Sequence, residues 1–125
     1  MKLAIIGSRN LTNVSIDEEV DKLKPTTIVS GGAKGIDTLA EDYAIRHNLP
    51  LIVYKPEYDK YPGKRAPIMR NNQIVDEADY VLAFWDGESQ GTMYTIHRAM
   101  KLGKATKVIK VENPNEKQER QFKLF

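Results

Sequence analysis

The chain alternates short apolar runs with longer stretches in which apolar residues recur every three or four positions. The short runs predict β-strands, and the recurrent spacing predicts amphipathic helices. Strands are expected at residues 2–6, 27–30, 51–54, 80–84 and 107–111. Because helices separate the strands, the crossovers should be right-handed and the sheet mostly parallel. We therefore predict an α/β, Rossmann-like fold of about five strands with helices on both faces of the sheet.

The first two predicted helices begin differently. Ser15 and Glu18 have the spacing of a capping box, in which the serine hydroxyl accepts the N–H of the glutamate. The apolar stripe that follows consists of Ile16, Val20 and Leu23. The second helix opens after Gly35 and ends near Asn48. Its apolar positions are Ile36, Leu39, Ala40, Tyr43 and Ala44.

The second half of the chain predicts a long loop and two further helices. Residues 55–64 mix charges, prolines and tyrosines without periodicity, which is typical of a loop, and long loops in compact domains are often functional. A helix is expected to begin near Pro67. Another starts around Gly91 and stops at Gly103. The residues that it should bury are Ile96, Ala99 and Met100.

Three glycine-bearing turns stand where predicted strands give way to helical patterns. A helix that begins directly after such a turn has unpaired N–H groups and a dipole that both favour an anion. All three turns follow the carboxyl ends of strands, where ligands bind in open α/β sheets. They therefore point to a nucleotide. The turns are Gly7-Ser8-Arg9, residues 30–37 (Ser-Gly-Gly-Ala-Lys-Gly-Ile-Asp) and residues 86–92 (Asp-Gly-Glu-Ser-Gln-Gly-Thr).

Composition narrows the class of protein. The 125 residues suffice for one domain, which we expect over residues 1–112, followed by a polar tail at 113–125. A formal net charge of +2 does not imply a dedicated nucleic-acid surface. Without cysteine, disulfides and thiolate sites are excluded, and no metal constellation or cofactor motif is present. The apolar runs are too short to span a bilayer and the N-terminus is not a signal peptide, so we expect a cytoplasmic protein with no membrane partner.

The order of these motifs resembles the SLOG superfamily. The motifs are Gly7-Ser8-Arg9, the 30–37 turn, Arg70-Asn71, Ala78-Asp79 and the 87–92 turn. That superfamily joins the Rossmann domain of DNA-processing protein A, the LOG phosphoribohydrolases and the small YspA and YpsA type proteins. The resemblance extends to about Val111. Residues 61–66, ahead of Arg70-Asn71, and residues 84–87 look most like the YspA/YpsA branch.

The resemblance implies a nucleotide-type ligand across the carboxyl edge of the sheet. Its phosphate would lie on the 87–92 turn, where the Ser89 and Thr92 hydroxyls can donate and Gly91 permits close approach. Arg70 matches an arginine that relatives place near the glycosidic bond or on phosphate, and Asn71 would position a sugar. The full set of candidate ligand-binding residues is Gly7, Ser8, Arg9, Ser30, Gly31, Gly32, Asp37, Arg70, Asn71, Trp85, Gly87, Ser89, Gly91 and Thr92.

Several candidates have a second interpretation. Asp37 would accept a bond from a ribose hydroxyl or serve only as a helix-capping carboxylate. Arg9 would pair with an anion or simply be solvated. Trp85 would stack on a base or pack in a core or interface, and Tyr58 and Tyr61 are weaker stacking candidates. Surface or helix-end positions are expected for both histidines, His47 and His97.

Catalysis depends on one position. By resemblance, LOG enzymes carry a catalytic glutamate three residues after the threonine of this turn, and here Thr95 occupies that place. A hydroxyl does not replace a carboxylate in glycosidic cleavage. Hydrolysis is therefore weakened and binding is favoured. Hydrolysis is not excluded, because Asp37, Asp86 and Glu88 remain alternative carboxylates.

Three functions follow in order of preference. The first is a sensor or carrier of a nucleoside phosphate or ADP-ribose-like molecule, and the second is a nucleoside 5′-monophosphate phosphoribohydrolase. The third is single-stranded DNA binding, for which Glu57 and Asp59 interrupt the basic loop, so nucleic acid is an unlikely partner. The basic and aromatic candidates for it are Lys55, Lys60, Lys64, Arg65, Tyr54, Tyr58 and Tyr61. A homo-oligomer is also expected, and the tail, with Phe122, Leu124 and Phe125, would dock on a partner subunit or fray.

Overall fold

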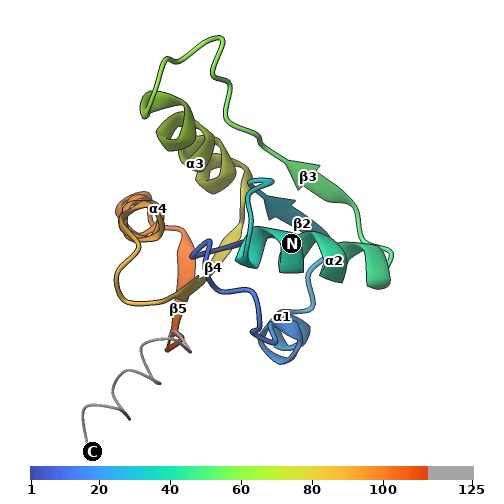
Figure 1. The fold of residues 1–125 in the computed structure, drawn as a ribbon. Coiled ribbons are helices and arrows are strands. Elements are labelled where there is room, and N and C mark those ends of the chain that lie inside the picture. Colours follow the sequence, from blue (N-terminus) through green and yellow to red (C-terminus); the bar gives the residue numbers. More distant parts are fainter. Residues whose placement is uncertain (113–125) are drawn as a thin grey trace, which may run out of the picture.

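A computed structural model of the chain describes residues 1–112, so the predicted tail at 113–125 lies outside the described residues. Strands and helices alternate throughout this part (Figure 1). The strands are β1 (Lys2–Gly7), β2 (Thr27–Ser30), β3 (Leu51–Val53), β4 (Tyr80–Trp85) and β5 (Ala105–Lys110). The helices are α1 (Asp17–Leu23), α2 (Ile36–Arg46), α3 (Arg65–Glu77) and α4 (Gln90–Lys101).

The five strands form one parallel sheet in the order β3-β2-β1-β4-β5. Leu3 of β1 pairs with Ile28 of β2 on one side and with Tyr80 of β4 on the other, so β1 is the central strand. The strand order reverses between β1 and β4, which makes the carboxyl end of these two strands the expected ligand-binding position. The predicted α/β, Rossmann-like fold is confirmed.

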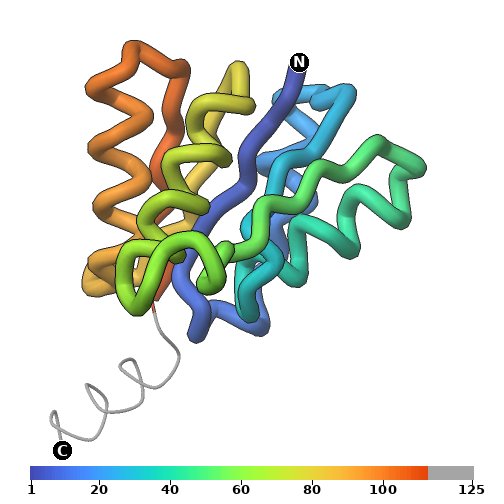
Figure 2. Tube along the Cα trace, turned by 90° about the horizontal axis from the view of Figure 1, so that it is seen from above, coloured from blue at the N-terminus to red at the C-terminus, as the bar shows by residue number. Residues whose placement is uncertain are grey.

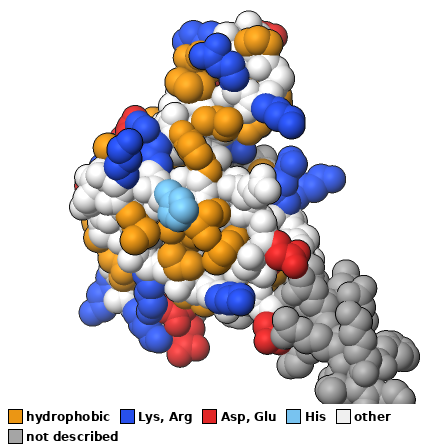
Figure 3. Space-filling view, turned by 90° about the vertical axis from the view of Figure 1, so that its left-hand side faces the viewer, with side chains coloured by type: hydrophobic (Ala, Val, Ile, Leu, Met, Phe, Trp, Pro, Cys, Tyr) orange, Lys and Arg blue, Asp and Glu red, His pale blue; other side chains and the backbone are white. Residues whose placement is uncertain are grey.

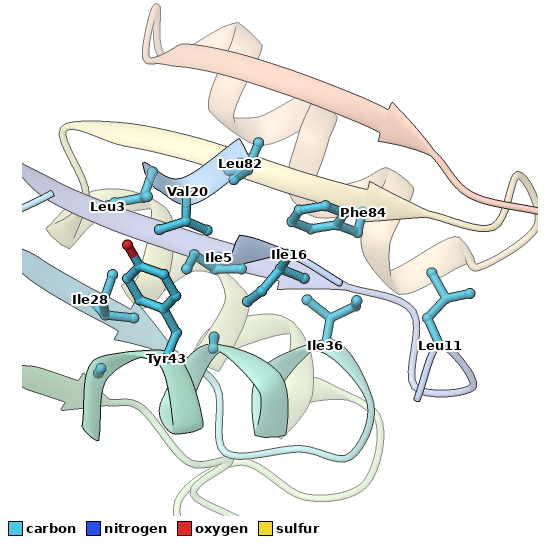
Figure 4. Close-up of a cluster of buried hydrophobic side chains, with 12 residues drawn as sticks. Leu3, Ile5, Leu11, Ile16, Val20, Ile28, Ile36, Tyr43, Leu82 and Phe84 are labelled. Carbon is cyan, nitrogen blue, oxygen red and sulfur yellow. The ribbon is translucent and has the colours of Figure 1, made fainter. Parts of the chain in front are cut away.

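Each face of the sheet is covered by two helices. On one face α1 and α2 pack on alternate residues of the central strands, including Ile5 and Phe84, as Figure 4 shows. On the other face α3 and α4 cover the intervening residues, including Ala4 and Ala83. Side chains of successive strand residues point to opposite faces, so a strand buried on both faces is apolar at every position. This explains the unbroken apolar runs of β1 and β4.

The start of α1 corrects one prediction. The helix begins at Asp17 with Ile16 at its N-cap, no side chain caps it, and the capping box of Ser15 and Glu18 is therefore wrong. Ile16 is buried in the core, and this burial determines where the chain enters α1, while Ser15 stays exposed. The predicted stripe is confirmed, because Val20 is buried and Leu23 packs against the same core.

The other helices also depart from the sequence pattern in detail. Helix α3 starts at Arg65, so Pro67 lies in its first turn, where a missing N–H costs nothing. In α4 Ile96 and Ala99 are buried as predicted, but Met100 is 62% exposed, so its predicted burial is wrong. Figure 3 shows hydrophobic side chains around a histidine on the side of the molecule where α4 lies in Figure 1. Tyr94 and Leu102 of this region are also exposed.

The loops that follow the strands gather at one end of the molecule. Figure 2 shows the segments after β1, β2 and β3 and the start of α4 at this end, with the N-terminus at the opposite end. Chain segments far apart in the sequence therefore meet at the carboxyl edge of the sheet. Within residues 1–112, no helix is both long and apolar enough to cross a membrane.

Candidate functional site

A pocket of about 480 Å³ opens at the carboxyl edge of the sheet, at the position where the strand order reverses. It is bordered by the ends of β1 and β2, the loop after β3, and helices α3 and α4. Most of the predicted ligand-binding residues meet there. Those that line the pocket are Gly7, Arg9, Gly32, Asp37, Arg70, Asn71, Ser89, Gly91 and Thr92.

Arg70 reaches the pocket from α3 and is held by two hydrogen bonds. Its Nε donates to Oδ1 of Asn71 at 2.8 Å, and its Nη1 donates to the carbonyl oxygen of Gly31 at 2.6 Å. Within residues 1–112, Nη2 has no hydrogen-bond partner and no carboxylate forms an ion pair with Arg70. Burial lowers the pKa of the guanidinium, although the charge of Asp37 opposes that effect. The pocket therefore holds a positioned cation with a free donor edge.

Asp37 lies in the first turn of α2 and is only 8% exposed. Its Oδ2 accepts the backbone N–H of Ala33 at 3.1 Å, which holds the turn between β2 and α2. Oδ1 accepts no hydrogen bond from the described part of the chain and is not sealed from solvent. Burial raises the pKa of the Asp37 carboxyl, and the Ala33 N–H and the charge of Arg70 offset part of this rise. Oδ2 of Asp37 thus serves as the capping acceptor, while Oδ1 is the oxygen that is open to a ligand.

The turn between β4 and α4 is organised by Asp86. One oxygen of its carboxylate accepts the backbone N–H groups of Glu88 and Ser89, at 2.9 and 2.8 Å. Burial raises the pKa of Asp86, but these two bonds together with the side chains of Ser8 and Asn10 outweigh that effect, and the pKa lies below its ordinary value. Asp86 is therefore an anion that holds the turn through one of its oxygens.

Ser89 and Thr92 begin α4 at the rim of the pocket. Ser89 is the N-cap residue, and its Oγ accepts the N–H of Thr92 at 3.4 Å and pairs with the Thr92 hydroxyl at 3.1 Å. Gly91 is exposed between them, and a Cβ built on it would meet no atom of the described chain within 4 Å. The start of α4 thus presents hydroxyls and first-turn N–H groups to open space in the pocket.

The remaining predicted residues lie behind the pocket wall. The Ser8 hydroxyl accepts the backbone N–H of Asp86 at 3.2 Å, and the Ser30 hydroxyl lies 3.4 Å from the Asp37 carbonyl oxygen, to which it donates. The indole N–H of Trp85 donates to the carbonyl oxygen of Ser89 at 3.0 Å, and the ring packs against the core beneath α3 and α4. Trp85 therefore supports the turn from outside the pocket lining. Gly31 and Gly87 also lie outside the lining.

Two of the glycines serve packing between turns. A Cβ on Gly7 would lie 2.5 Å from the carbonyl oxygen of Phe84, and one on Gly35 would lie 2.5 Å from the carbonyl oxygen of Arg9. Gly35 also has a positive φ of 74°, which favours glycine. The first two glycine turns therefore contact each other closely, and this close packing brings Arg9 to the pocket.

Sequence reasoning left several lining residues out of the ligand-binding set. Thr95 is buried and lines the pocket, and its hydroxyl donates to the carbonyl oxygen of Gly91 at 3.0 Å. The place of the LOG glutamate is thus filled by a hydroxyl bonded to its own helix. Tyr58, considered only as a weak stacking candidate, lines the pocket from the loop after β3, and Tyr61 does not. The apolar lining is supplied by Ile6, Ala33, Pro56, Pro67 and Ile74, for which composition gives no local signal.

The fold and the pocket define a Rossmann-like α/β protein with a small-molecule-sized site at the carboxyl edge of its sheet. Residues 1–61 match the model of the YspA, cpYpsA-related SLOG family. This match covers just under half of the chain, and together with the likeness of the fold to DNA processing protein A from Helicobacter pylori it bears out the predicted resemblance to the SLOG superfamily.

One curated relative is the Gene 61 protein of Mycobacterium phage D29. It is 35% identical over 81 residues, which is 61% of this chain and 65% of that protein, so the match spans just under two thirds of the relative's length.

Two solved structures share the fold. DNA processing protein A from Helicobacter pylori, whose structure concerns its single-stranded DNA binding mode, matches with a TM-score of 0.69 and 25% identity over 97% of this chain and 73% of that one. DNA processing protein A from Streptococcus pneumoniae matches with a TM-score of 0.65 and 23% identity, over 89% of this chain and 50% of that one, and supports the fold alone. The likeness to the Helicobacter pylori protein weakens the expectation that nucleic acid is an unlikely partner.

Proposed function

We propose that the pocket binds a nucleoside phosphate or a related nucleotide derivative, and that the protein is a sensor or carrier of that molecule. The observation that carries this proposal is the state of Arg70, whose guanidinium faces the pocket with Nη2 unpartnered within residues 1–112. A partly desolvated cation without a carboxylate partner gains interaction energy when an anion enters beside it. Burial already lowers the pKa of Arg70, and a bound phosphate would reverse that effect.

The opposite wall supports the same ligand. Ser89, Gly91 and Thr92 line the pocket at the start of α4, where a helix of twelve residues directs its dipole toward an anion. Arg9 contributes a second positive charge, which lies near enough to Arg70 and Asp37 to influence both of their pKa values. A volume of about 480 Å³ is within the range of small-molecule sites.

Calorimetric titration of the full chain tests this function. The panel consists of nucleoside 5′-mono- and diphosphates with each common base, ADP-ribose, and the unphosphorylated nucleosides as controls. We expect the phosphorylated members to bind and the nucleosides to bind more weakly. Chromatography of each mixture afterwards should return the nucleotide intact, because Thr95 offers no carboxylate. Absence of binding by every phosphorylated member at millimolar concentration would contradict the proposal.

Single-stranded DNA is a second candidate, favoured by the likeness to the Helicobacter pylori protein. The loop after β3 and the start of α3 carry Lys55, Lys60, Lys64 and Arg65, all exposed. Lysine and arginine side chains project from the upper part of the molecule in Figure 3, where α3 and the preceding loop lie in Figure 1. Glu57 reduces this charge, since it lies 4.0 Å from the ammonium group of Lys60.

A salt series separates this candidate from nucleotide binding. Binding of a fluorescent oligo(dT) should weaken steeply as salt concentration rises if several lysines contact phosphates. No change in anisotropy at low salt would exclude the DNA function and leave the nucleotide function intact.

A further inference from the structure

The pocket contains a carboxylate that an anion-binding site alone does not require. Asp37 is 8% exposed and lines the same pocket as Arg70 and Arg9. Its Oδ2 is occupied by the Ala33 N–H, while Oδ1 has no donor within residues 1–112. An ionised carboxylate only accepts hydrogen bonds, so a ligand that displaces water from Oδ1 has to offer it a hydroxyl or an N–H.

Asp37 and Arg70 lie close together, and this proximity limits which part of the ligand can donate to Oδ1 of Asp37. A Cβ on Gly31 would lie 2.8 Å from Nη1 of Arg70 and 2.9 Å from Oδ2 of Asp37, so both groups flank one backbone position. A phosphate on Arg70 therefore places its neighbouring atoms beside Asp37. In a nucleoside phosphate those neighbouring atoms are the sugar, and the base lies farther away.

Resting on the proposed function, we propose that Asp37 selects ligands with free ribose hydroxyls and rejects deoxyribose and the DNA backbone. The 2′-hydroxyl of ribose donates to Oδ1 beside the phosphate that Arg70 holds. In a DNA strand the sugar lacks the 2′-hydroxyl and its 3′-oxygen is esterified, so no sugar hydroxyl can donate. The carboxylate would instead face flanking phosphates of like charge. A site built to bind a hydroxyl discriminates strongly against an analogue that lacks it, because the buried acceptor is left unpaired.

The test uses sugar phosphates without a base, so that base recognition plays no part. Ribose 5-phosphate, 2-deoxyribose 5-phosphate and inorganic phosphate are titrated into the full chain, with binding followed by NMR chemical-shift changes. Adenosine, 2′-deoxyadenosine and 2′,3′-dideoxyadenosine 5′-monophosphates form a second series. We expect the affinity to fall by about tenfold or more from the ribose forms to the forms that lack the 2′-hydroxyl.

Two variants assign the effect to the carboxylate. Asp37→Asn keeps an acceptor for Ala33 and removes the charge, so the preference for ribose should shrink and phosphate alone should bind at least as well as before. Thr38→Ala is the matched control, because its hydroxyl donates to the carbonyl oxygen of the same Ala33 at 3.2 Å but lies outside the pocket lining. Thr38→Ala should keep the full preference.

The outcomes separate this inference from the proposed function. Equal binding of the ribose and deoxyribose forms overturns the role of Asp37 and leaves nucleotide binding in place. An unchanged ribose preference in Asp37→Asn also overturns it. Failure of every phosphate-bearing probe to bind contradicts the proposed function itself, and the selectivity with it.

Discussion

The guanidinium of Arg70 donates to the carbonyl oxygen of Gly31 across a distance of 2.6 Å. This bond ties α3 to the turn after β2, two segments far apart in the sequence that meet at the carboxyl edge of the sheet. Because it uses only one terminal nitrogen, the other stays available to the pocket. The relationship fixes Arg70 in place without neutralising it, which is the arrangement that an anion-binding site requires.

Gly31→Ala should disturb ligand binding more than folding. The added Cβ would lie within 3 Å of Nη1 of Arg70 and Oδ2 of Asp37, which belong to side chains that can move. We expect the variant to fold, with nucleotide affinity reduced by about tenfold or more through displacement of Arg70. Calorimetry and thermal unfolding of the same sample measure the two effects.

Gly7→Ala, in contrast to Gly31→Ala, should lower the stability of the fold. Its Cβ would meet the backbone carbonyl oxygen of Phe84 at 2.5 Å and the side chain of Ile36, and backbone in the sheet cannot yield. We expect a loss of about 1–3 kcal/mol in the free energy of unfolding. Gly31→Ala losing more stability than Gly7→Ala would contradict this comparison.

Gly91→Ala should have opposite effects on stability and binding. Its Cβ would enter open space at the start of α4, and alanine is the better helix former, so we expect a gain of up to about 1 kcal/mol in stability. That open space belongs to the pocket, so nucleotide affinity should fall. Chemical denaturation gives the first quantity and calorimetry the second. Unchanged affinity would show that the ligand does not approach Gly91.

Asp37→Asn should stabilise the unliganded protein at neutral pH. Burial raises the pKa of Asp37 above its ordinary value of 3.8, so the folded state binds a proton more strongly than the unfolded state does. The ionised side chain therefore costs stability above its folded-state pKa, and that cost disappears below its unfolded-state value. We expect the difference in unfolding free energy between the variant and the original chain to shrink as the pH falls toward and below 3.8. A difference that grows on acidification would contradict the burial effect.

Tyr43→Phe tests the contact between α1 and α2. The Tyr43 hydroxyl donates to Oδ1 of Asp21 at 2.5 Å, and burial together with that bond raises the pKa of Tyr43 to about 12. The stabilisation is fully present below the ordinary value of 10.0 and is lost as the pH rises through about 12. We expect the variant to lose about 1 kcal/mol at neutral pH. Denaturation curves measured between neutral and alkaline pH should show this deficit closing.

The alternation of elements could be predicted from the sequence because it depends on local apolar patterns. Residues 3–6 of β1 and all residues of β4 are apolar, and apolar positions in the helices recur every three or four residues, so the parallel sheet could be predicted directly. Convergence of the glycine turns at one edge followed from the topology alone. The prediction of a capping box was wrong because burial of Ile16 sets the start of α1. The predicted burial of Met100 was wrong because the spacing of apolar residues does not show which face of a helix is left uncovered.

The site was less accessible to sequence reasoning. Gly7 was predicted to bind the ligand, and Gly35 was predicted only to precede the second helix, but contacts with distant carbonyl groups require glycine at both positions. Trp85 was a stacking candidate, and only the structure shows its indole bonded to Ser89 outside the pocket. The proximity of Arg70 to Asp37 depends on how α3 packs against the turn after β2, which no local pattern encodes.

Titration of the tightest-binding nucleotide from the panel into Arg70→Ala tests the central claim most directly. Arg65→Ala is the matched control, because Arg65 is exposed at the start of the same helix and lies outside the pocket lining. We predict that Arg70→Ala weakens binding by about tenfold to a hundredfold, the range expected for a lost charge-assisted hydrogen bond, while Arg65→Ala binds like the original chain. Equal affinity of the Arg70→Ala variant and the original chain would contradict the account.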